Sequence, residues 1–105
     1  MAAEASGRVL LTHAAGLHAR PCVKLTKLAR TFVAAIELAA DAAGPWVDAK
    51  SIVRVMAAKV PQHATLHFRA SGEDAGEAVE ALVRLVRDDF ADGENSPVRG
   101  DGRSA

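Results

Sequence analysis

The chain of 105 residues is half apolar and carries 13 basic and 13 acidic side chains, so it suits one domain with one core. It lacks the basic excess of a general nucleic-acid or membrane-surface binder, its apolar runs fall short of the roughly 20 residues that cross a bilayer, and residues 1–7 lack the regions of a secretory signal. Cys22 is the single cysteine and can form no internal disulfide, which favours a reducing compartment. We therefore expect a cytoplasmic domain without membrane insertion and without nucleic acid as a partner.

The pattern of apolar and turn-forming residues predicts seven elements. In chain order they are a strand at 8–12, a helix at 19–30, a strand at 31–40, a short strand at 46–48, a short helix that follows Ser51 and stops before Pro61, a strand at 65–70 and a helix at 75–90. Pro21 fits the first helix because an N–H in a first turn has no helical partner to lose. Asp74 and Glu77 have the spacing of a capping box at the start of the last helix.

This order of elements predicts an α+β fold, an open-faced sandwich in which helices cover one face of a sheet. Residues 8–90 form the predicted domain, and residues 1–7 are expected to be a flexible terminus. Residues 91–105 are rich in Gly, Ser, Asp and Arg and show no periodicity, so we expect a disordered tail or linker there.

The segment most informative about chemistry is Gly16-Leu17-His18-Ala19-Arg20-Pro21. It places His18 at the start of a helix, where backbone N–H groups have no acceptor and the helix dipole adds partial positive charge. A phosphate on the imidazole would meet those N–H groups and the Arg20 guanidinium. From the residues alone, the alternative is that His18 only caps the helix and that Arg20 is a solvated charge.

The other reactive side chains have simpler interpretations. Ser51 suits the N-cap of the short helix. Cys22 shares helical spacing with Leu25 and is expected in the core. His63 and His67 are four residues apart, but they fall at a predicted strand and therefore do not share a helical face as zinc ligands do. We predict no metal site.

Three segments resemble the HPr family of the phosphoenolpyruvate-dependent phosphotransferase system. Residues 16–21 match the family's active-site motif, residues 48–52 resemble its regulatory-serine segment, and residues 70–74 open the last helix as in the family. The resemblance covers about residues 8–90. It implies a four-stranded antiparallel sheet covered on one face by helices, in the order βαββαβα.

The resemblance implies a phosphoryl carrier rather than an enzyme, with no cofactor. His18 would be phosphorylated at Nδ1 by phospho-enzyme I and would pass the group to an enzyme IIA domain in sugar uptake, while Arg20 neutralises the phosphoryl oxygens. Two alternatives stay open: a regulatory, nitrogen-type relay, and an interaction module that is never phosphorylated. The carrier is expected to be a monomer.

The resemblance also implies a partner-binding surface on the first helix and the short helix. The residues expected to contact partners are Arg20, Pro21, Lys24, Lys27, Ile52, Arg54 and Met56. In some members of the family an HPr kinase/phosphorylase modifies the residue that Ser51 matches, although a capping role explains this serine by itself. Arg54 replaces the small residue usual in the family. Glycines commonly follow the short helix in the family, but Ala58, Lys59 and His63 occupy this stretch here.

Overall fold

The computed structural model describes residues 3–91. Its elements are β1 (Glu4–Leu10), α1 (Ala19–Ala29), β2 (Ala35–Ala39), β3 (Val47–Asp48), α2 (Ile52–Ala57), β4 (Thr65–Ser71) and α3 (Ala75–Arg87). Within these residues, four strands form one sheet in the order β1-β4-β2-β3, and each neighbouring pair is antiparallel. The predicted class, element order and strand direction are confirmed.

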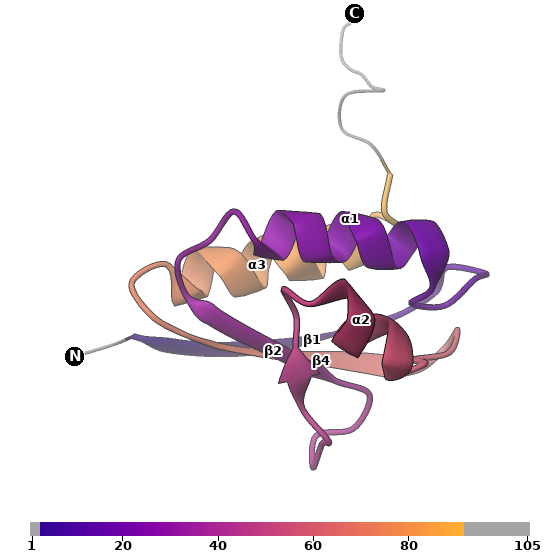
Figure 1. Cartoon of the computed structure of the whole chain (residues 1–105), viewed down its shortest axis with the longest axis horizontal. Helices are drawn as coiled ribbons and strands as arrows, with labels where there is room; N and C mark the ends of the chain where they lie inside the picture. The colour runs from indigo at the N-terminus through magenta and orange to yellow at the C-terminus, as the bar shows by residue number, and fades with distance from the viewer. Residues whose placement is uncertain (1–2, 92–105) are drawn as a thin grey trace, which may run out of the picture.

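The molecule has two layers. Helices α1 and α3 lie side by side over one face of the sheet, and α2 packs beside α1 (Figure 1). On the opposite face, the described part of the chain places no helix, and the β2–β3 connection projects there (Figure 1). We call these the covered face and the open face; together they make an open-faced sandwich.

The core lies between the covered face and the helices. The sheet contributes alternate residues, as expected for strands with one buried side. Those from β2 and β4 are Ile36, Leu38, Leu66, Phe68 and Ala70. Those from α1 and α3 recur at helical spacing, at Cys22, Leu25, Ala29, Ala78, Leu82 and Val86. One contiguous cluster of this kind holds both layers together.

β1 begins earlier than predicted. The expected flexible terminus is wrong for residues 4–7, because the strand starts at Glu4 and pairs residue by residue with β4. A Cβ added to Gly7 would lie 2.9 Å from Cγ1 of Val79 on α3. Because α3 packs this closely, the strand carries glycine at residue 7 rather than a large apolar side chain. The alternation of large apolar and polar residues that predicts a strand is therefore missing at residues 4–7.

β2 is shorter than the predicted strand at 31–40. Thr31 and Phe32 continue the last turn of α1, since their N–H groups donate to the carbonyls of Leu28 (3.0 Å) and Ala29 (3.2 Å). The ladder with β4 therefore starts only at Ala35.

α3 is also shorter than predicted, since it ends at Arg87 rather than Phe90. Asp89 and Phe90 have left-handed backbones, with φ of 58° and 61°, and the Phe90 N–H donates to the Leu85 carbonyl at 2.8 Å. This turn brings the Phe90 ring back into the core, where it is buried as expected. Of the predicted tail, residues 92–105 lie outside the described residues.

The predicted capping box is wrong. Asp74 precedes α3, but its carboxylate makes no capping bond to that helix. It accepts instead from the N–H groups of Val33 (2.9 Å) and Ala34 (2.8 Å), and so joins the start of α3 to the segment that leads into β2. Because the Val33 N–H, the Ala34 N–H and the nearby Lys50 ammonium favour the ionised form, the pKa of Asp74 is lowered.

Candidate functional site

His18 stands immediately before α1, as its N-cap residue. Its backbone is extended (φ −139°, ψ 160°), and its side chain makes no capping hydrogen bond. The N–H groups of Ala19 and Arg20 donate no hydrogen bond within residues 3–91. The helix start therefore offers unpaired donors, and the positive end of the dipole, to any anion carried by His18.

Backbone contacts hold the loop that precedes His18. The Leu17 N–H donates to the Val60 carbonyl at 2.9 Å, and the Leu17 side chain is buried. Gly16 has φ +65°, and a Cβ at this position would lie 2.7 Å from the same Val60 oxygen. A left-handed backbone this close to a neighbouring carbonyl requires glycine. Gly16 thus fixes where His18 stands.

The first residue of α1 is strained. Ala19 has φ 46°, a left-handed conformation that costs an alanine about 1–2 kcal/mol. The change in backbone direction between the extended His18 and the helix is concentrated at this residue. Strain of this sort persists only where surrounding contacts determine the backbone.

The imidazole of His18 is exposed at the rim of a hollow of about 470 Å³. The hollow is lined mainly by apolar residues of the preceding loop and of the end of α2. Besides His18 these are Ala15, Leu17, Met56, Ala57, Lys59, Val60 and Pro61. A partner protein can reach the ring from outside, and the one cationic side chain among these lining residues is Lys59.

Arg20 lies two residues after His18, in the first turn of α1. Its side chain is exposed and makes no hydrogen bond or ion pair within the described part of the chain. A guanidinium without a structural partner can donate two parallel hydrogen bonds to a phosphoryl group. The fold therefore leaves Arg20 available beside His18.

α2 begins at the residue predicted to cap it. The Ser51 Oγ accepts a hydrogen bond from the Arg54 N–H at 3.2 Å, so the capping interpretation is confirmed. α2 packs against α1, and the Cys22 Sγ lies 3.7 Å from the Ile52 carbonyl oxygen. Cys22 is buried as expected, and burial raises the pKa of its thiol.

The predicted partner surface is only partly available. Lys27 and Arg54 are exposed, whereas Ile52 and Met56 are half-buried against the core. Pro21 is buried in the first turn of α1, which contradicts its expected place on that surface. Pro21 packs inward because it lies on the buried side of α1, with Cys22 and Leu25, whereas Ala19 and Arg20 are exposed.

Lys24 also has a structural contact. It is half-buried, and its ammonium donates to the Phe90 carbonyl at 2.8 Å. It therefore ties the turn after α3 to α1. If Lys24 also attracts acidic partner surfaces, it does so while making this hydrogen bond.

Two residues near the site were not predicted to belong to it. Val53 is 73% exposed, which makes it the most exposed of the large apolar residues of α2. Lys59 has a left-handed backbone, with φ 50°. Periodicity over a six-residue helix cannot separate its exposed from its buried apolar residues. The one signal for Lys59 is that glycines are common after the short helix in the family that the chain resembles.

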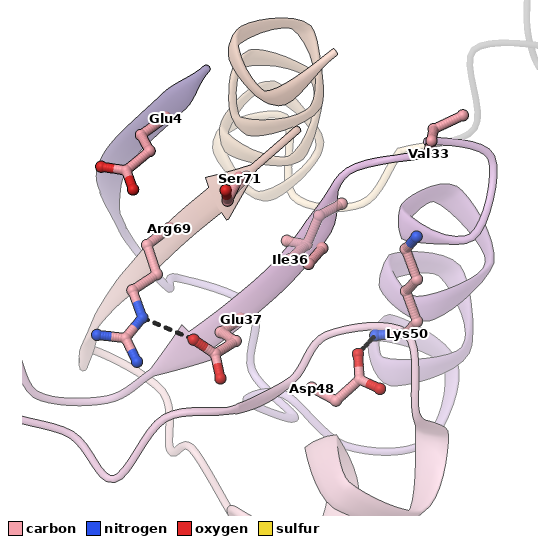
Figure 2. A pocket seen from close by; sticks show the side chains of 10 residues that line it. Glu4, Val33, Ile36, Glu37, Asp48, Lys50, Arg69 and Ser71 are labelled. Carbon is pink, nitrogen blue, oxygen red and sulfur yellow. Dashed lines mark hydrogen bonds and ion pairs between the residues drawn. The ribbon is translucent and has the colours of Figure 1, made fainter. Parts of the chain in front are cut away.

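A second hollow, of about 840 Å³, lies elsewhere, on the open face. In Figure 2 the Arg69 and Glu37 side chains point toward each other there, with Arg69 Nε 2.7 Å from Glu37 Oε1. Arg69 also lies 4.1 Å over the Trp46 ring. Arg69 and Glu37 form an ion pair across neighbouring strands. The residues that line this hollow include no histidine.

Within residues 3–91 there is no group of three or more His, Cys, Asp or Glu side chains arranged to hold a metal ion. Among the helices of the same residues, none is long and apolar enough to cross a membrane.

The site combines an exposed histidine at an uncapped helix start with an unengaged arginine two residues later, on an open-faced βαββαβα sandwich. A family model described as "PTS HPr component phosphorylation site" matches residues 5–88. The chain belongs to the HPr family of phosphocarrier proteins of the phosphotransferase system.

Individual relatives agree with this assignment. The chain is 40% identical over 79 residues to the phosphocarrier protein HPr of Cupriavidus necator, covering 75% of this chain and 86% of the relative. It is 31% identical over 83 residues to the phosphocarrier protein NPr of Proteus mirabilis, covering 79% and 91%. Among solved structures, HPr-C-His from Thermoanaerobacter tengcongensis superposes with a TM-score of 0.77 at 31% identity, over 84% of this chain and 97% of that one.

Proposed function

We propose that His18 accepts a phosphoryl group from phospho-enzyme I and passes it to an enzyme IIA domain. The observation that carries the proposal is the exposed imidazole at the start of α1, beside unpaired N–H groups and an unengaged Arg20. Backbone N–H groups at a helix start and a guanidinium two residues away both favour an anion, and this supports a phosphohistidine dianion at His18.

The transfer makes one bond and breaks one bond at phosphorus. The neutral imidazole attacks through Nδ1, the new N–P bond forms, and the bond between phosphorus and the donor histidine of enzyme I breaks. The electron pair of that bond stays on the donor ring. Because phosphoryl transfer passes through a loose transition state, position and charge supply the acceleration. Arg20 neutralises charge on the phosphoryl oxygens, and the helix start adds its dipole.

In this role the protein is a carrier and not an enzyme. The group leaves His18 by the reverse chemistry when a receiving histidine attacks the phosphorus. An exposed ring at the rim of a shallow hollow suits this use, because donor and acceptor must each approach the same nitrogen in turn. A deep pocket would exclude them.

The test is incubation of the purified protein with enzyme I and phosphoenolpyruvate, followed by intact mass measurement. One phosphate should be gained, and the adduct should be labile in acid and stable in base, as a phosphoramidate is. His18→Ala should gain none. His63→Ala is the matched control, since His63 is another exposed histidine, and it should be labelled like the unaltered chain.

Labelling that survives His18→Ala would overturn the assignment of His18. An unaltered chain that gains no phosphate from any enzyme I of its own cell would instead favour the interaction module, in which the histidine is never phosphorylated.

We place the carrier in sugar uptake, with a nitrogen-type regulatory relay as the second candidate. The similarity to an HPr at 40% identity supports the first role, and the match to an NPr at 31% identity supports the second. The two are separated by offering the phosphorylated protein to the enzyme IIA domains of both systems. Transfer at least tenfold faster to the sugar-type domain supports the proposal, and the opposite preference overturns it.

A further inference from the structure

Lys59 occupies a position that suits glycine rather than lysine. It follows α2 directly after the C-cap residue Ala58, and its backbone is left-handed at φ 50°. In this conformation Cβ crowds the carbonyl oxygen, which glycine avoids. The conformation is therefore unfavourable for lysine and needs a compensating reason.

Nothing in the fold supplies that reason. The Lys59 side chain is exposed, and within the described residues its ammonium makes no hydrogen bond and no ion pair. Its backbone N–H donates to the Met56 carbonyl at 3.2 Å, a bond that glycine would make equally well. The side chain thus contributes no hydrogen bond or ion pair that stabilises the domain.

The same residue is a neighbour of His18. The hydrogen bond from the Leu17 N–H to the Val60 carbonyl joins the two loops, and His18 and Lys59 are the residues that flank this bond, one on each loop. Both residues line the hollow of about 470 Å³. The four-carbon stem of a lysine bridges the remaining distance easily and keeps its three donors free to rotate.

We propose that Lys59 is a second cation for the phosphoryl group on His18, in addition to Arg20. This proposal rests on the proposed function, since it concerns the phosphorylated state of that histidine. Arg20 and the helix start approach the group from α1, whereas Lys59 approaches it from the end of α2. The dianion is then held between the two segments that build the hollow, and its charge is shared by two side chains.

The experiment uses three variants at Lys59. Lys59→Ala keeps the left-handed strain and removes the charge, Lys59→Arg keeps both, and Lys59→Gly removes both. Transfer from enzyme I at subsaturating carrier should fall about three- to tenfold in the Ala and Gly variants and stay near the unaltered value in the Arg variant. Lys59→Gly should also unfold at a higher temperature than Lys59→Ala, because the strain is gone.

His63 provides a matched control. It is also exposed and left-handed, with φ 75°, but it does not line the hollow. His63→Gly should raise the unfolding temperature as Lys59→Gly does, yet it should leave transfer unchanged. If Lys59 affected transfer only through the structure of its turn, the transfer rate would change in both Lys59→Gly and His63→Gly.

A second readout separates this proposal from the carrier function itself. Accessible histidines are phosphorylated chemically with potassium phosphoramidate, and the phosphorus NMR signal that is missing in His18→Ala is assigned to His18. The last ionisation of that phosphoryl group is then followed by NMR. A nearby ammonium favours the dianion, so the titration should shift to higher pH in Lys59→Ala and should return in Lys59→Arg. If enzyme I does not phosphorylate the chain but the titration still shifts in Lys59→Ala, the carrier function is overturned and the role of Lys59 beside a phosphoryl group is supported. Identical titrations and transfer rates in the Ala and Arg variants would overturn the role of Lys59.

Discussion

The starts of α1 and α3 differ in what their polar groups do. At α3, the Asp74 carboxylate accepts two backbone N–H groups from the segment before β2 and has a lowered pKa. At α1, His18 makes no capping bond and Arg20 has no partner in residues 3–91. The first of these helix starts joins two parts of the fold, and the second leaves its donors unused.

The contrast teaches where the chain tolerates unsatisfied polar groups. Unpaired donors at a helix end are costly when they are buried, and they are cheap when water can reach them. The α1 start is exposed, so water satisfies it until a phosphoryl group replaces that water. The α3 start is where the fold gains stability, and the α1 start is where it keeps reactivity.

The strongest way to break this contrast is to disturb the backbone that holds His18. Gly16→Ala places a Cβ 2.7 Å from the Val60 oxygen, in a left-handed residue. Stability should fall by roughly 2–4 kcal/mol, since overpacking adds to the left-handed penalty. Urea unfolding measures the loss, and transfer should fall too because the loop must shift. A variant as stable as the unaltered chain would show that the loop is adaptable.

Arg20→Ala should act on transfer without acting on the fold. Loss of a charge-assisted contact to the phosphoryl oxygens should lower kcat/KM for phosphorylation by enzyme I about 10- to 100-fold. The unfolding temperature should not change, since Arg20 is exposed and makes no hydrogen bond or ion pair in the described structure. Arg20→Lys should recover only part of the rate, because a lysine lacks the planar fork. Full activity of the alanine variant would make Arg20 a surface charge.

Asp74→Asn should act on the fold without acting on transfer. The lowered pKa of Asp74 means that its ionised form stabilises the folded state above the ordinary value of 3.8 and that this contribution is lost as the pH falls below it. The variant should therefore be less stable at pH 7, and the difference should shrink between about pH 4 and pH 2. Thermal unfolding across this range measures both effects. A difference that does not depend on pH would mean that the charge is irrelevant.

The smallest expected effect concerns Ser51, at the start of the short helix α2. Ser51→Ala removes the hydrogen bond from the Arg54 N–H and should cost about 0.5–2 kcal/mol of stability with transfer little changed. Ser51→Asp keeps a capping oxygen, so its stability should hold. We propose that its charge weakens acceptance from enzyme I through a higher KM, by repelling acidic partner groups. If Asp leaves transfer untouched while Ala destabilises, Ser51 is only a cap.

The sequence predicted those parts of the fold whose signal is local. The alternation at 65–70, the stripe of α3 and the serine cap of α2 all depend on neighbours in sequence. The motif at 16–21 likewise placed His18 and Arg20 in one turn. Local patterns of this kind are readable because each residue type suits its immediate backbone.

What the sequence did not predict depends on contacts between distant segments. Gly7 lies in β1 because α3 approaches it closely, and Asp74 binds the N–H groups of residues 40 and 41 positions earlier rather than those of its own helix. Pro21 is buried by the packing of α1 on the core. Lys59 joins the site only because the Leu17–Val60 hydrogen bond brings two loops together.

The burial of Cys22 makes the contact between α1 and α2 directly measurable. Its thiol is inaccessible in the closed structure, and burial raises its pKa, so little reactive thiolate is present. A thiol reagent can therefore modify it only during excursions that separate these helices, and the modification rate counts those excursions. Because Cys22 is the single cysteine of the chain, this signal comes from one place, on the helix that starts beside His18. The protein thus reports its own local opening without an added label.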